Sequence, residues 1–331
     1  MRIAAIVSLT GEGAGDTSSA PHKRSSSQVS GISNDTSYAH FDVLGKSLLD
    51  REISKLERFG VQRHAVIAEA SSTQFLPSRN STSGDSVETW ERAVAHQIAE
   101  GVDHLLFVRP SAYTDLDYFQ FLEFHLESRS PITRAYAADG ALDLALLDAS
   151  RLTNVGPGYR KALSALIPEQ RRYAYRGYVN PLGRPQDFYQ LVDDGLRKKC
   201  GLRPLGTETQ PWVWQGADSE IDSSAVIIGP AFIGARSRIG PCCTVDAGSS
   251  IERDCEVDCG TVIEESWVMQ DTYLGVALDV RHSVVGQDTL FNLDRNVEVR
   301  IGDRNLIGAV EKSTWLAGLG SLFSIEERTA A

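Results

Sequence analysis

The sequence lacks the long apolar runs that mark membrane-spanning and secreted proteins. Its apolar run at residues 3–9 is too short to span a bilayer, and Arg2 is the one basic residue that precedes it within the chain. No small-residue cleavage site follows an extended apolar core, so a buried first strand explains the run better than a signal peptide. We therefore expect no membrane association and a cytoplasmic protein.

Cysteine and basic residues are also scarce. The five cysteines are odd in number and form no matched pair of CxxC motifs, which argues against a disulfide framework and a zinc site. We expect reduced, mostly buried thiols. Only 33 Lys and Arg face 44 Asp and Glu, and the formal net charge is -11. Nucleic-acid binding needs a basic face for phosphates, so small molecules or proteins are the expected partners.

The second half of the chain contains a six-residue repeat. Apolar residues occupy every sixth position: Ile221, Ile227, Ile233, Ile239, Val245, Ile251, Val257, Ile263 and Met269. Small residues stand four positions after the first seven, in a series that ends before Trp267: Ala225, Ala231, Ser237, Cys243, Ser249, Cys255 and Thr261. This period predicts a triangular coil of three short strands per turn, with the apolar side chains stacked inside.

The repeat resembles the hexapeptide repeats of left-handed parallel β-helices, and "IGARSR" and "IGPCCT" fit that motif best. We expect Ile221, Ile239 and Val257 to form one inward column. Cys243 and Cys255 then fill positions that require a small side chain.

The regular repeat has an end in the sequence. Beyond Met269 the frame slips at Gly275, and we expect irregular coils as far as about Gly308. Trp267 stands where a small residue belongs, and a bulky aromatic there either closes the end of the core or contacts another chain. Together with the flat faces of the coils, this favours self-association through the β-helix.

The first half alternates strand and helix patterns, which is typical of a parallel sheet covered by helices. The predicted strands cover residues 3–9, 65–68 and 104–108, and the predicted helices cover 46–59, 88–99 and 116–126. The stretch "DGALDLALLDAS" indicates a later strand behind an Asp139-Gly140 turn. The predicted fold class is therefore α/β, a Rossmann-like domain followed by a left-handed parallel β-helix.

The predicted organisation has four parts: an α/β domain over 1–205, a linker over 206–220, the β-helix over 221–310 and a tail over 311–331. A long segment rich in Ser, Gly and Thr separates the first strand from the first helix. It carries Gly11, Gly13 and Gly15 on alternate positions. A strand that runs into a glycine-rich turn exposes backbone N–H groups to an anion, so these glycines are a candidate phosphate loop.

An α/β domain followed by a hexapeptide β-helix resembles the sugar-1-phosphate nucleotidyltransferases, which include mannose-1-phosphate guanylyltransferase. Three stretches carry this resemblance: "FDVLGKSLLDREISKLERFGVQRHAVI", "TDLDYFQFLEFHLES" and "GYVNPLGRPQDFYQLVDDGL". In that family a sugar 1-phosphate attacks the α-phosphorus of a nucleoside triphosphate and expels pyrophosphate. The transfer depends on divalent metal and on cations that offset the phosphate charge.

The resemblance also shows what this chain has lost. Gly15 stands where the family has an arginine after its glycine loop, and Tyr38 lies near the position of its lysine. The metal-binding Asn-Gly-Asp is replaced by Arg109-Pro110-Ser111, and the second metal-binding Asp coincides with Pro181. The comparison therefore implies a degenerate domain with no catalytic residue and no required cofactor.

Some binding residues remain as candidates by resemblance. Lys46 follows the glycine of the "LGKSL" turn, and Arg184 stands where the family has a threonine. If the domain is active instead, magnesium would need replacement ligands, for which Asp115, Asp117 and Asp187 lie close in sequence to the lost ones. Asp115 and Asp117 have a simpler role as carboxylates in the first turn of a helix.

Three functional hypotheses follow. The leading one is a non-catalytic relative that binds a nucleotide or sugar nucleotide, or a catalytic homologue, and regulates or scaffolds polysaccharide precursor synthesis. The second is an active sugar-1-phosphate nucleotidyltransferase that uses magnesium. The third is an acyltransferase, because hexapeptide β-helices also host acyl transfer with a histidine base, and His282 is the only histidine after residue 125.

Overall fold

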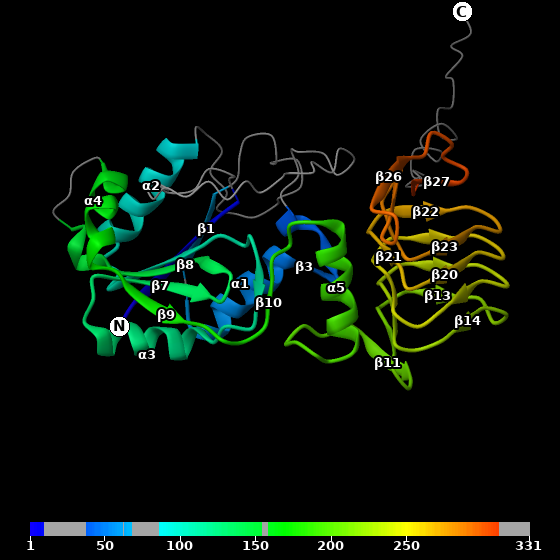
Figure 1. The fold of residues 1–331 in the computed structure, drawn as a ribbon, viewed down its shortest axis with the longest axis horizontal. Coiled ribbons are helices and arrows are strands. Elements are labelled where there is room, and N and C mark those ends of the chain that lie inside the picture. The colour runs from blue at the N-terminus through cyan, green and yellow to red at the C-terminus, as the bar shows by residue number, and fades with distance from the viewer. Residues whose placement is uncertain (10–37, 62, 68–85, 154–157, 311–331) are drawn as a thin grey trace, which may run out of the picture.

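The computed structural model describes residues 1–9, 38–61, 63–67, 86–153 and 158–310. It shows an α/β domain followed by a stack of short parallel strands in several sheets, as in a β-helix (Figure 1). The candidate phosphate loop with Gly11, Gly13 and Gly15 lies outside the described residues, as does the expected tail over 311–331. No described helix is both long and apolar enough to cross a lipid bilayer.

Strands from the described part of the first domain form a mixed sheet in the order β4-β1-β5-β8-β7-β9. They are β1 (Ile3–Ser8), β4 (Arg63–Ile67), β5 (His104–Val108), β7 (Ile132–Ala137), β8 (Gly140–Asp148) and β9 (Arg171–Ala174). β1 is parallel to β4 and β5, and β7 is parallel to β9. The sheet is mainly parallel, as the alternation of strands and helices predicts, but the turn before Gly140 makes β7 and β8 an antiparallel hairpin and β8 also runs antiparallel to β5.

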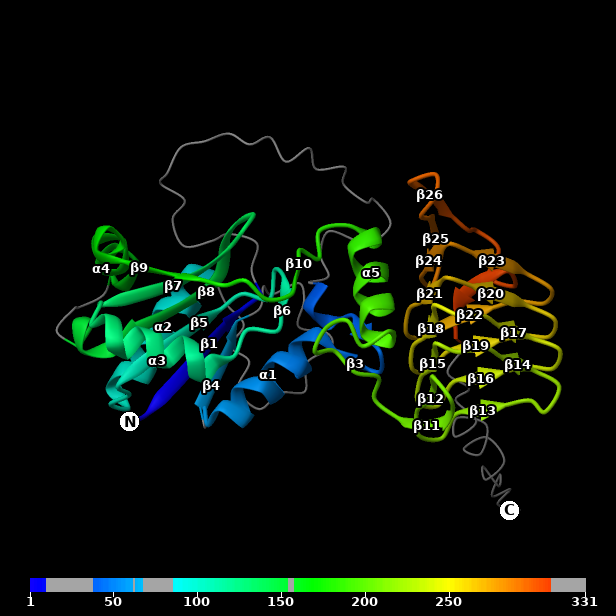
Figure 2. The same ribbon diagram turned by 60° about the horizontal axis from the view of Figure 1, so that its bottom comes forward.

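Helices cover both faces of this sheet (Figure 2). They are α1 (Leu48–Phe59), α2 (Ser86–Ala99), α3 (Tyr118–Ser128) and α4 (Tyr159–Leu166), and α5 (Pro185–Leu196) stands beyond the sheet. Successive residues of a strand point to opposite faces. In β1, Val7 packs with Leu56 of α1 and Phe121 of α3, whereas Ile6 belongs to the core that contains Val94 of α2.

The helix starts differ slightly from the predicted ones. The helix expected over 46–59 begins only at Leu48, because Ser47 pairs in a short hairpin and acts as the N-cap. The helix expected over 116–126 begins after its own N-cap, Asp117. Short elements complete the domain: η1 (Tyr38–His40), β2 (Asp42–Val43), β3 (Lys46–Ser47), β6 (Tyr113–Thr114), η3 (Ala149–Arg151), η4 (Ile167–Glu169) and β10 (Val179–Asn180).

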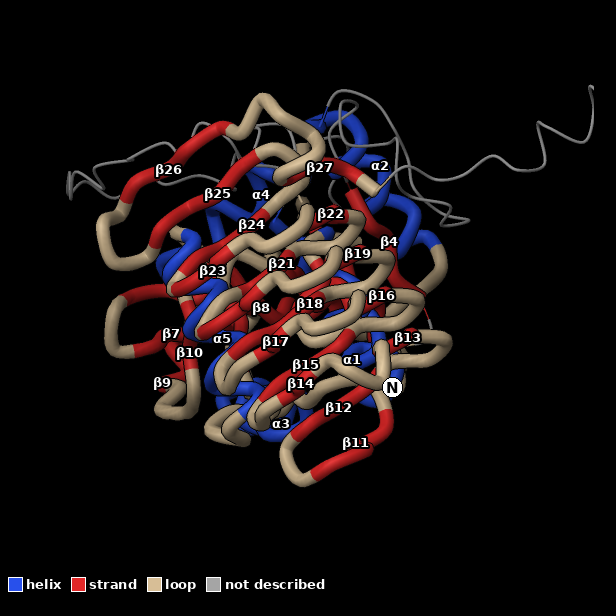
Figure 3. The backbone as a smooth tube through the Cα atoms, turned by 90° about the vertical axis from the view of Figure 1, so that its right-hand side faces the viewer, coloured by secondary structure: helices blue, strands red, loops and turns tan. Residues whose placement is uncertain are grey.

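The second region winds through short strands that stack in rows (Figure 3). In chain order they are β11 (Thr207–Gln210), β12 (Val213–Gln215), β13 (Glu220–Ile221), β14 (Val226–Ile227), β15 (Ala231–Ile233), β16 (Arg238–Ile239), β17 (Thr244–Val245), β18 (Ser249–Ile251), β19 (Glu256–Val257), β20 (Val262–Glu264), β21 (Trp267–Val268), β22 (Thr272–Leu274), β23 (Asp279–Arg281), β24 (Ser283–Val285), β25 (Thr289–Asn292), β26 (Val297–Arg300) and β27 (Ile307–Ala309). β11 and β12 fall within the segment expected as a linker, and β12 pairs in parallel with β15.

The predicted inward column is confirmed. Ile221 lies opposite Ile239, Ile239 opposite Val257, and Val257 opposite Leu274 in parallel register. The five small residues that carry a hydroxyl or thiol also have a shared role, because their side chains donate hydrogen bonds to carbonyl oxygens of the next coil: Ser237, Cys243, Ser249, Cys255 and Thr261. The Thr261 hydroxyl, for example, donates to the Gly275 carbonyl oxygen at 2.6 Å.

The frame slips earlier than predicted. Ile251 lies opposite Val268, not Met269, so the step from Ile263 to the next inward residue is five residues long. Ser266 then takes the small-residue position and is fully buried. The slip expected at Gly275 is wrong as well, because β22, β23 and β24 continue the parallel rows before β25 and β26 turn antiparallel.

Trp267 points out of the β-helix and packs within its own chain. Its ring stacks on Phe188 of α5, with the ring centroids 5.7 Å apart and the planes at 12°. In register with Trp267, an outward row of the same sheet contributes Trp214, Phe232 and Val284 to one core with the α/β domain. Trp267 is fully buried there, so it neither closes the end of the coil core nor remains available to a second chain.

A buried carboxylate fixes this junction between the two regions. Glu252 has no exposed surface, and its carboxylate accepts the backbone N–H groups of Leu44 and Gly45, each at 2.8 Å. Gly45 has a φ of +88°, and a Cβ there would lie 2.8 Å from Phe232 Cζ. The turn between β2 and β3 therefore needs glycine both for its conformation and for its close approach to the β-helix.

Candidate functional site

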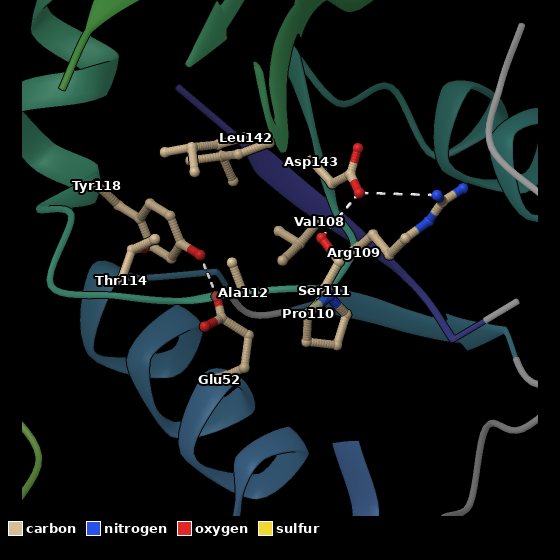
Figure 4. Close-up of a pocket in the computed structure, with 11 residues that line it drawn as sticks. Glu52, Val108, Arg109, Pro110, Ser111, Ala112, Thr114, Tyr118, Leu142 and Asp143 are labelled. Atoms are coloured by element: carbon tan, nitrogen blue, oxygen red, sulfur yellow. Dashed lines mark hydrogen bonds and ion pairs between the residues drawn. The ribbon is translucent and has the colours of Figure 1, made fainter. Parts of the chain in front are cut away.

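The parallel strands β1, β4 and β5 end at the same edge of the sheet, at Ser8, Ile67 and Val108. Ligands of open α/β sheets bind in the crevice outside the carboxyl ends of such strands. A pocket lies at the end of β5 (Figure 4). Its described lining comes from α1, the segment after β5, α3 and β8: Glu52, Val108, Arg109, Pro110, Ser111, Ala112, Thr114, Tyr118, Leu142, Asp143 and Leu144.

Asp143 of β8 organises one side of the pocket. Its Oδ2 accepts a hydrogen bond from the Ser111 hydroxyl at 2.8 Å and lies 3.7 Å from Arg109 Nη1. Its Oδ1 lies 3.8 Å from Arg134 Nη2. One carboxylate therefore faces two guanidinium groups, and this side of the pocket carries positive charge.

The other side of the pocket ties α1 to α3. The Tyr118 hydroxyl donates to the Glu52 carboxylate, and Lys55 Nζ lies 4.4 Å from the centre of the Tyr118 ring. Lys55 also donates to the Thr114 carbonyl oxygen at 3.3 Å. Burial raises the pKa of Tyr118 well above its ordinary value and lowers the pKa of Lys55. Tyr118 therefore stays protonated at neutral pH and acts as a donor.

The positions that carry metal in the nucleotidyltransferases hold other chemistry here. Ser111 places a hydroxyl at the pocket where the resemblance puts a carboxylate, and Pro181 follows β10 without an ionisable side chain. Tyr38 begins η1. Across the described ranges, no group of three or more His, Cys, Asp and Glu side chains is placed to hold a metal ion.

The three candidate replacement acids have local partners. Asp115 accepts the Gly201 backbone N–H at 2.7 Å and the Tyr113 hydroxyl at 3.0 Å. Asp117 caps α3 by accepting the Phe119 backbone N–H at 2.8 Å. Asp117 thus acts at the start of α3 as its N-cap, whereas Asp115 contacts Gly201 and Tyr113 and lies before the helix, so the first-turn role expected for Asp115 is wrong.

Asp187, the third acid, lies in the first turn of α5 and forms an ion pair with Arg184 at 3.0 Å. The structure thus brings together one candidate acid and one candidate cation. The hydrogen bond that Arg184 donates to the Asp187 carboxylate raises the pKa of Arg184, which is otherwise exposed to solvent. Lys46 lies in β3 and donates from Nζ to the Ser54 hydroxyl at 2.6 Å. Neither Lys46 nor Arg184 belongs to the described lining of the pocket.

His282 lies on the β-helix between two carboxylates. Its Nε2 is 3.2 Å from Glu265 Oε2, and its Nδ1 is 3.0 Å from Asp294 Oδ1. A general base for acyl transfer needs a ring nitrogen directed at the substrate. In this arrangement each ring nitrogen faces a carboxylate.

Sequence reasoning missed Asp143, Arg134 and Glu52. Asp143 is the one charged residue in the apolar stretch "ALDLALL", and an acid at such a position in a core strand is a signal for a site at the edge of the sheet. Arg134 gives no comparable signal, because only the pairing of β7 with β8 brings it to Asp143. Glu52 lies on α1, whose sequence alone does not indicate contact with Tyr118.

The chain matches no model of a known protein family, and no curated protein matches it. The fold therefore stands as an α/β domain with a mixed sheet followed by stacked short parallel strands.

Proposed function

We propose that this protein is a non-catalytic relative of the sugar-1-phosphate nucleotidyltransferases that binds a nucleotide or sugar nucleotide at the carboxyl ends of β1 and β5. In this proposal it acts as a ligand-binding regulatory or scaffold subunit in polysaccharide precursor synthesis. The observation that carries the proposal is the segment after β5, where Arg109, Pro110 and Ser111 line the pocket. In the described lining, Arg109 supplies a cation for a phosphate ligand, and the two carboxylates, Glu52 and Asp143, already have partners.

The chemistry of nucleotidyl transfer explains why this matters. Charge builds on the phosphate oxygens during transfer, and magnesium bound by carboxylates lowers that barrier. The nearest acid on this side is Asp143, which already contacts Ser111, Arg109 and Arg134. An arginine-rich site whose described carboxylates already have partners favours binding of a phosphate over its transfer.

The active alternative would place magnesium on Asp115, Asp117 or Asp187. Asp117 caps a helix, Asp115 accepts two hydrogen bonds and Asp187 is ion-paired. A metal would have to displace each of these partners. The contacts therefore support the binding hypothesis over the enzyme hypothesis.

Two measurements test the proposal. The first supplies magnesium, each common nucleoside triphosphate and several sugar 1-phosphates, and follows pyrophosphate release; we expect none. Turnover of about 1 per second, the low end of the ordinary enzyme range, would contradict the proposal. In that case Asp115→Ala, Asp117→Ala and Asp187→Ala would identify the acid that holds magnesium.

The second measurement is a thermal-shift panel of nucleotides and sugar nucleotides, with and without magnesium. A ligand at 100 times its dissociation constant stabilises the folded protein by about 2.7 kcal/mol. We expect stabilisation by at least one ligand class in the absence of magnesium. No shift from any member of the panel would contradict ligand binding.

The partner part of the proposal concerns a catalytic homologue or a second copy of this chain. Edge strand β26 supports it, because Val297 and Val299 are 46% and 45% exposed and a free strand edge can pair with another chain. We expect sedimentation to show self-association in the micromolar range, and Val299→Lys to weaken it. A monomer throughout that range would contradict self-association.

A further inference from the structure

The sheet carries a pair of arginines beside the proposed ligand site. Arg134 of β7 lies opposite Arg172 of β9 in parallel register. Residues paired in this way point to the same face of a sheet, and neighbouring strands are about 4.8 Å apart. Tyr136 lies two positions after Arg134, on the same face. The two guanidinium groups and one aromatic ring therefore form a compact surface.

The Tyr136 ring lies under both arginines. The Arg172 guanidinium carbon is 4.8 Å from the ring centre, and that of Arg134 is 6.0 Å away. Cation–π contacts of this kind hold a guanidinium group in place while its N–H donors stay available. The surface is therefore ordered before a ligand arrives.

The charges on this surface do not balance. Asp143 contacts Arg134 at 3.8 Å and Arg109 at 3.7 Å, whereas Arg172 has no carboxylate partner in the part of the chain that the structure describes. Within the described residues, Asp143 thus pairs with two of the three guanidinium groups and leaves Arg172 without a carboxylate, in a protein whose formal net charge is -11. Like charges on paired positions of neighbouring strands are destabilising, so a bound anion would relieve the repulsion.

We propose that Arg134 and Arg172, with Tyr136 beneath them, bind the diphosphate group of the ligand. The planar guanidinium fork matches phosphate oxygens bidentately, and two such forks side by side suit two linked phosphates. Arg109 links this surface to the pocket at the end of β5 through Asp143. The assignment rests on the proposed function and names the residues that give it phosphate affinity.

The chain offers a matched control on the same strand. Arg171 precedes Arg172 in β9, is exposed, and pairs with Thr133 on the opposite face of the sheet. Arg171→Gln and Arg172→Gln remove the same charge at adjacent positions. A difference in ligand affinity between the two variants can therefore come only from a specific contact and not from the change in net charge.

Calorimetric titration of the full chain tests the assignment, with inorganic pyrophosphate, the common nucleoside diphosphates and their sugar nucleotides as probes at physiological salt. We expect Arg172→Gln and Arg134→Gln each to weaken binding by about 10-fold or more, because a charge-assisted bidentate contact is lost. We expect Arg171→Gln to change it by less than about 2-fold, since an exposed charge is screened. Arg172→Lys should restore only part of the affinity, because lysine lacks the planar fork.

The outcomes separate this assignment from the proposed function. Equal losses in Arg171→Gln and Arg172→Gln, or no loss in either, would overturn the phosphate assignment even if nucleotides bind. Binding of pyrophosphate that depends on Arg172, without binding of any nucleotide, would support the assignment and contradict the proposed function. Failure of every probe to bind the unaltered protein would overturn both. Circular dichroism of Arg134→Gln, which is partly buried, verifies that the variant folds.

Discussion

Replacement of Glu252 by glutamine tests how the two regions are joined. The Glu252 carboxylate is buried at the junction and is surrounded by donors. Its Oε1 accepts from Leu44 N at 2.8 Å, the Ser250 hydroxyl at 2.9 Å and Trp267 Nε1 at 3.1 Å, and its Oε2 accepts from Gly45 N at 2.8 Å. A glutamine of the same shape keeps one acceptor oxygen and turns the other position into a donor.

The magnitude follows from these contacts. At least one charge-assisted hydrogen bond is lost, and a side-chain N–H group then faces a buried backbone or indole N–H group. A hydrogen bond to a charged group contributes about 1.5–3 kcal/mol, and leaving a buried donor unsatisfied costs a similar amount. We expect Glu252→Gln to lower the free energy of unfolding by about 3 kcal/mol at pH 7.

The loss should depend on pH in a defined direction. Burial raises the pKa of Glu252 above its ordinary value. As the pH falls through that raised pKa, the carboxyl takes up a proton in the folded state before it does so in the unfolded state. Protonation therefore stabilises the folded state of the unaltered protein as the pH falls, whereas glutamine does not titrate, so the difference in unfolding free energy between the two proteins should widen toward acid pH.

Amide hydrogen exchange in the native protein provides the local readout, with urea unfolding as the global one. We expect protection of the Leu44 and Gly45 amides to fall by about 100-fold in Glu252→Gln. Glu256→Gln is the control, because Glu256 follows on the same coil and pairs with Arg238 at the surface. It should change the free energy of unfolding by less than about 0.5 kcal/mol. Unchanged protection at both amides, or equal destabilisation by both variants, would refute this account of the junction.

Three further predictions concern stability. Val257→Ala should lower the free energy of unfolding by about 2 kcal/mol, because the side chain is 1% exposed in an inward column. Val226→Ala, at a 51% exposed position, should lower it by less than about 0.5 kcal/mol, as measured by urea unfolding. Equal losses would contradict the inward column. Thr261→Val should lower the free energy of unfolding by about 2 kcal/mol, because the hydroxyl donates a hydrogen bond to the Gly275 carbonyl oxygen at 2.6 Å and accepts one from the Leu278 backbone N–H at 3.0 Å. An unchanged free energy of unfolding would contradict this role. Burial lowers the pKa of His125 from 6.5 to about 4, so the free energy of unfolding should decline by up to about 3 kcal/mol as the pH falls from 6.5 to 4. His125→Gln should flatten that decline in unfolding curves measured across this pH range. An unchanged slope would contradict the assignment of the decline to His125.

The β-helix could be predicted from sequence because its pattern is local and repeated. Ile221, Ile239 and Val257 each stack on the same position of the next coil. The regular spacing of apolar residues along the sequence is therefore also the regular spacing of inward side chains along the β-helix. The slip before Val268 could not be predicted in this way. Met269 is apolar too, and only strand pairing shows that the coil is one residue short.

The main features that the sequence did not predict are contacts between residues far apart in the chain. Glu252 is 208 positions from Leu44 along the chain, and a glutamate in a repeat is ordinarily a surface residue. The family resemblance makes Lys46 of the "LGKSL" turn a binding candidate and gives the preceding Gly45 no role. In the structure Gly45 is required where the turn meets Phe232.

The candidate site was predictable in place but not in composition. The alternation of strands and helices indicates the sheet edge where Arg109 and Ser111 lie. The arginine surface depends on the pairing of β7 with β9, which brings Arg134 and Arg172 together from segments that no local pattern connects. Gly11, Gly13 and Gly15 lie outside the described residues, and their role stays a prediction.

The shared core at the junction limits how this protein can be divided. Phe232 and Trp267 point away from the coils and are buried only because α5 and the β2–β3 turn cover them. A fragment that begins at the β-helix would present these rings to water, and a matching apolar surface would open on the α/β domain. Exchange of either half with that of another protein would therefore require both surfaces to change together. The two regions cannot be separated or recombined independently of each other.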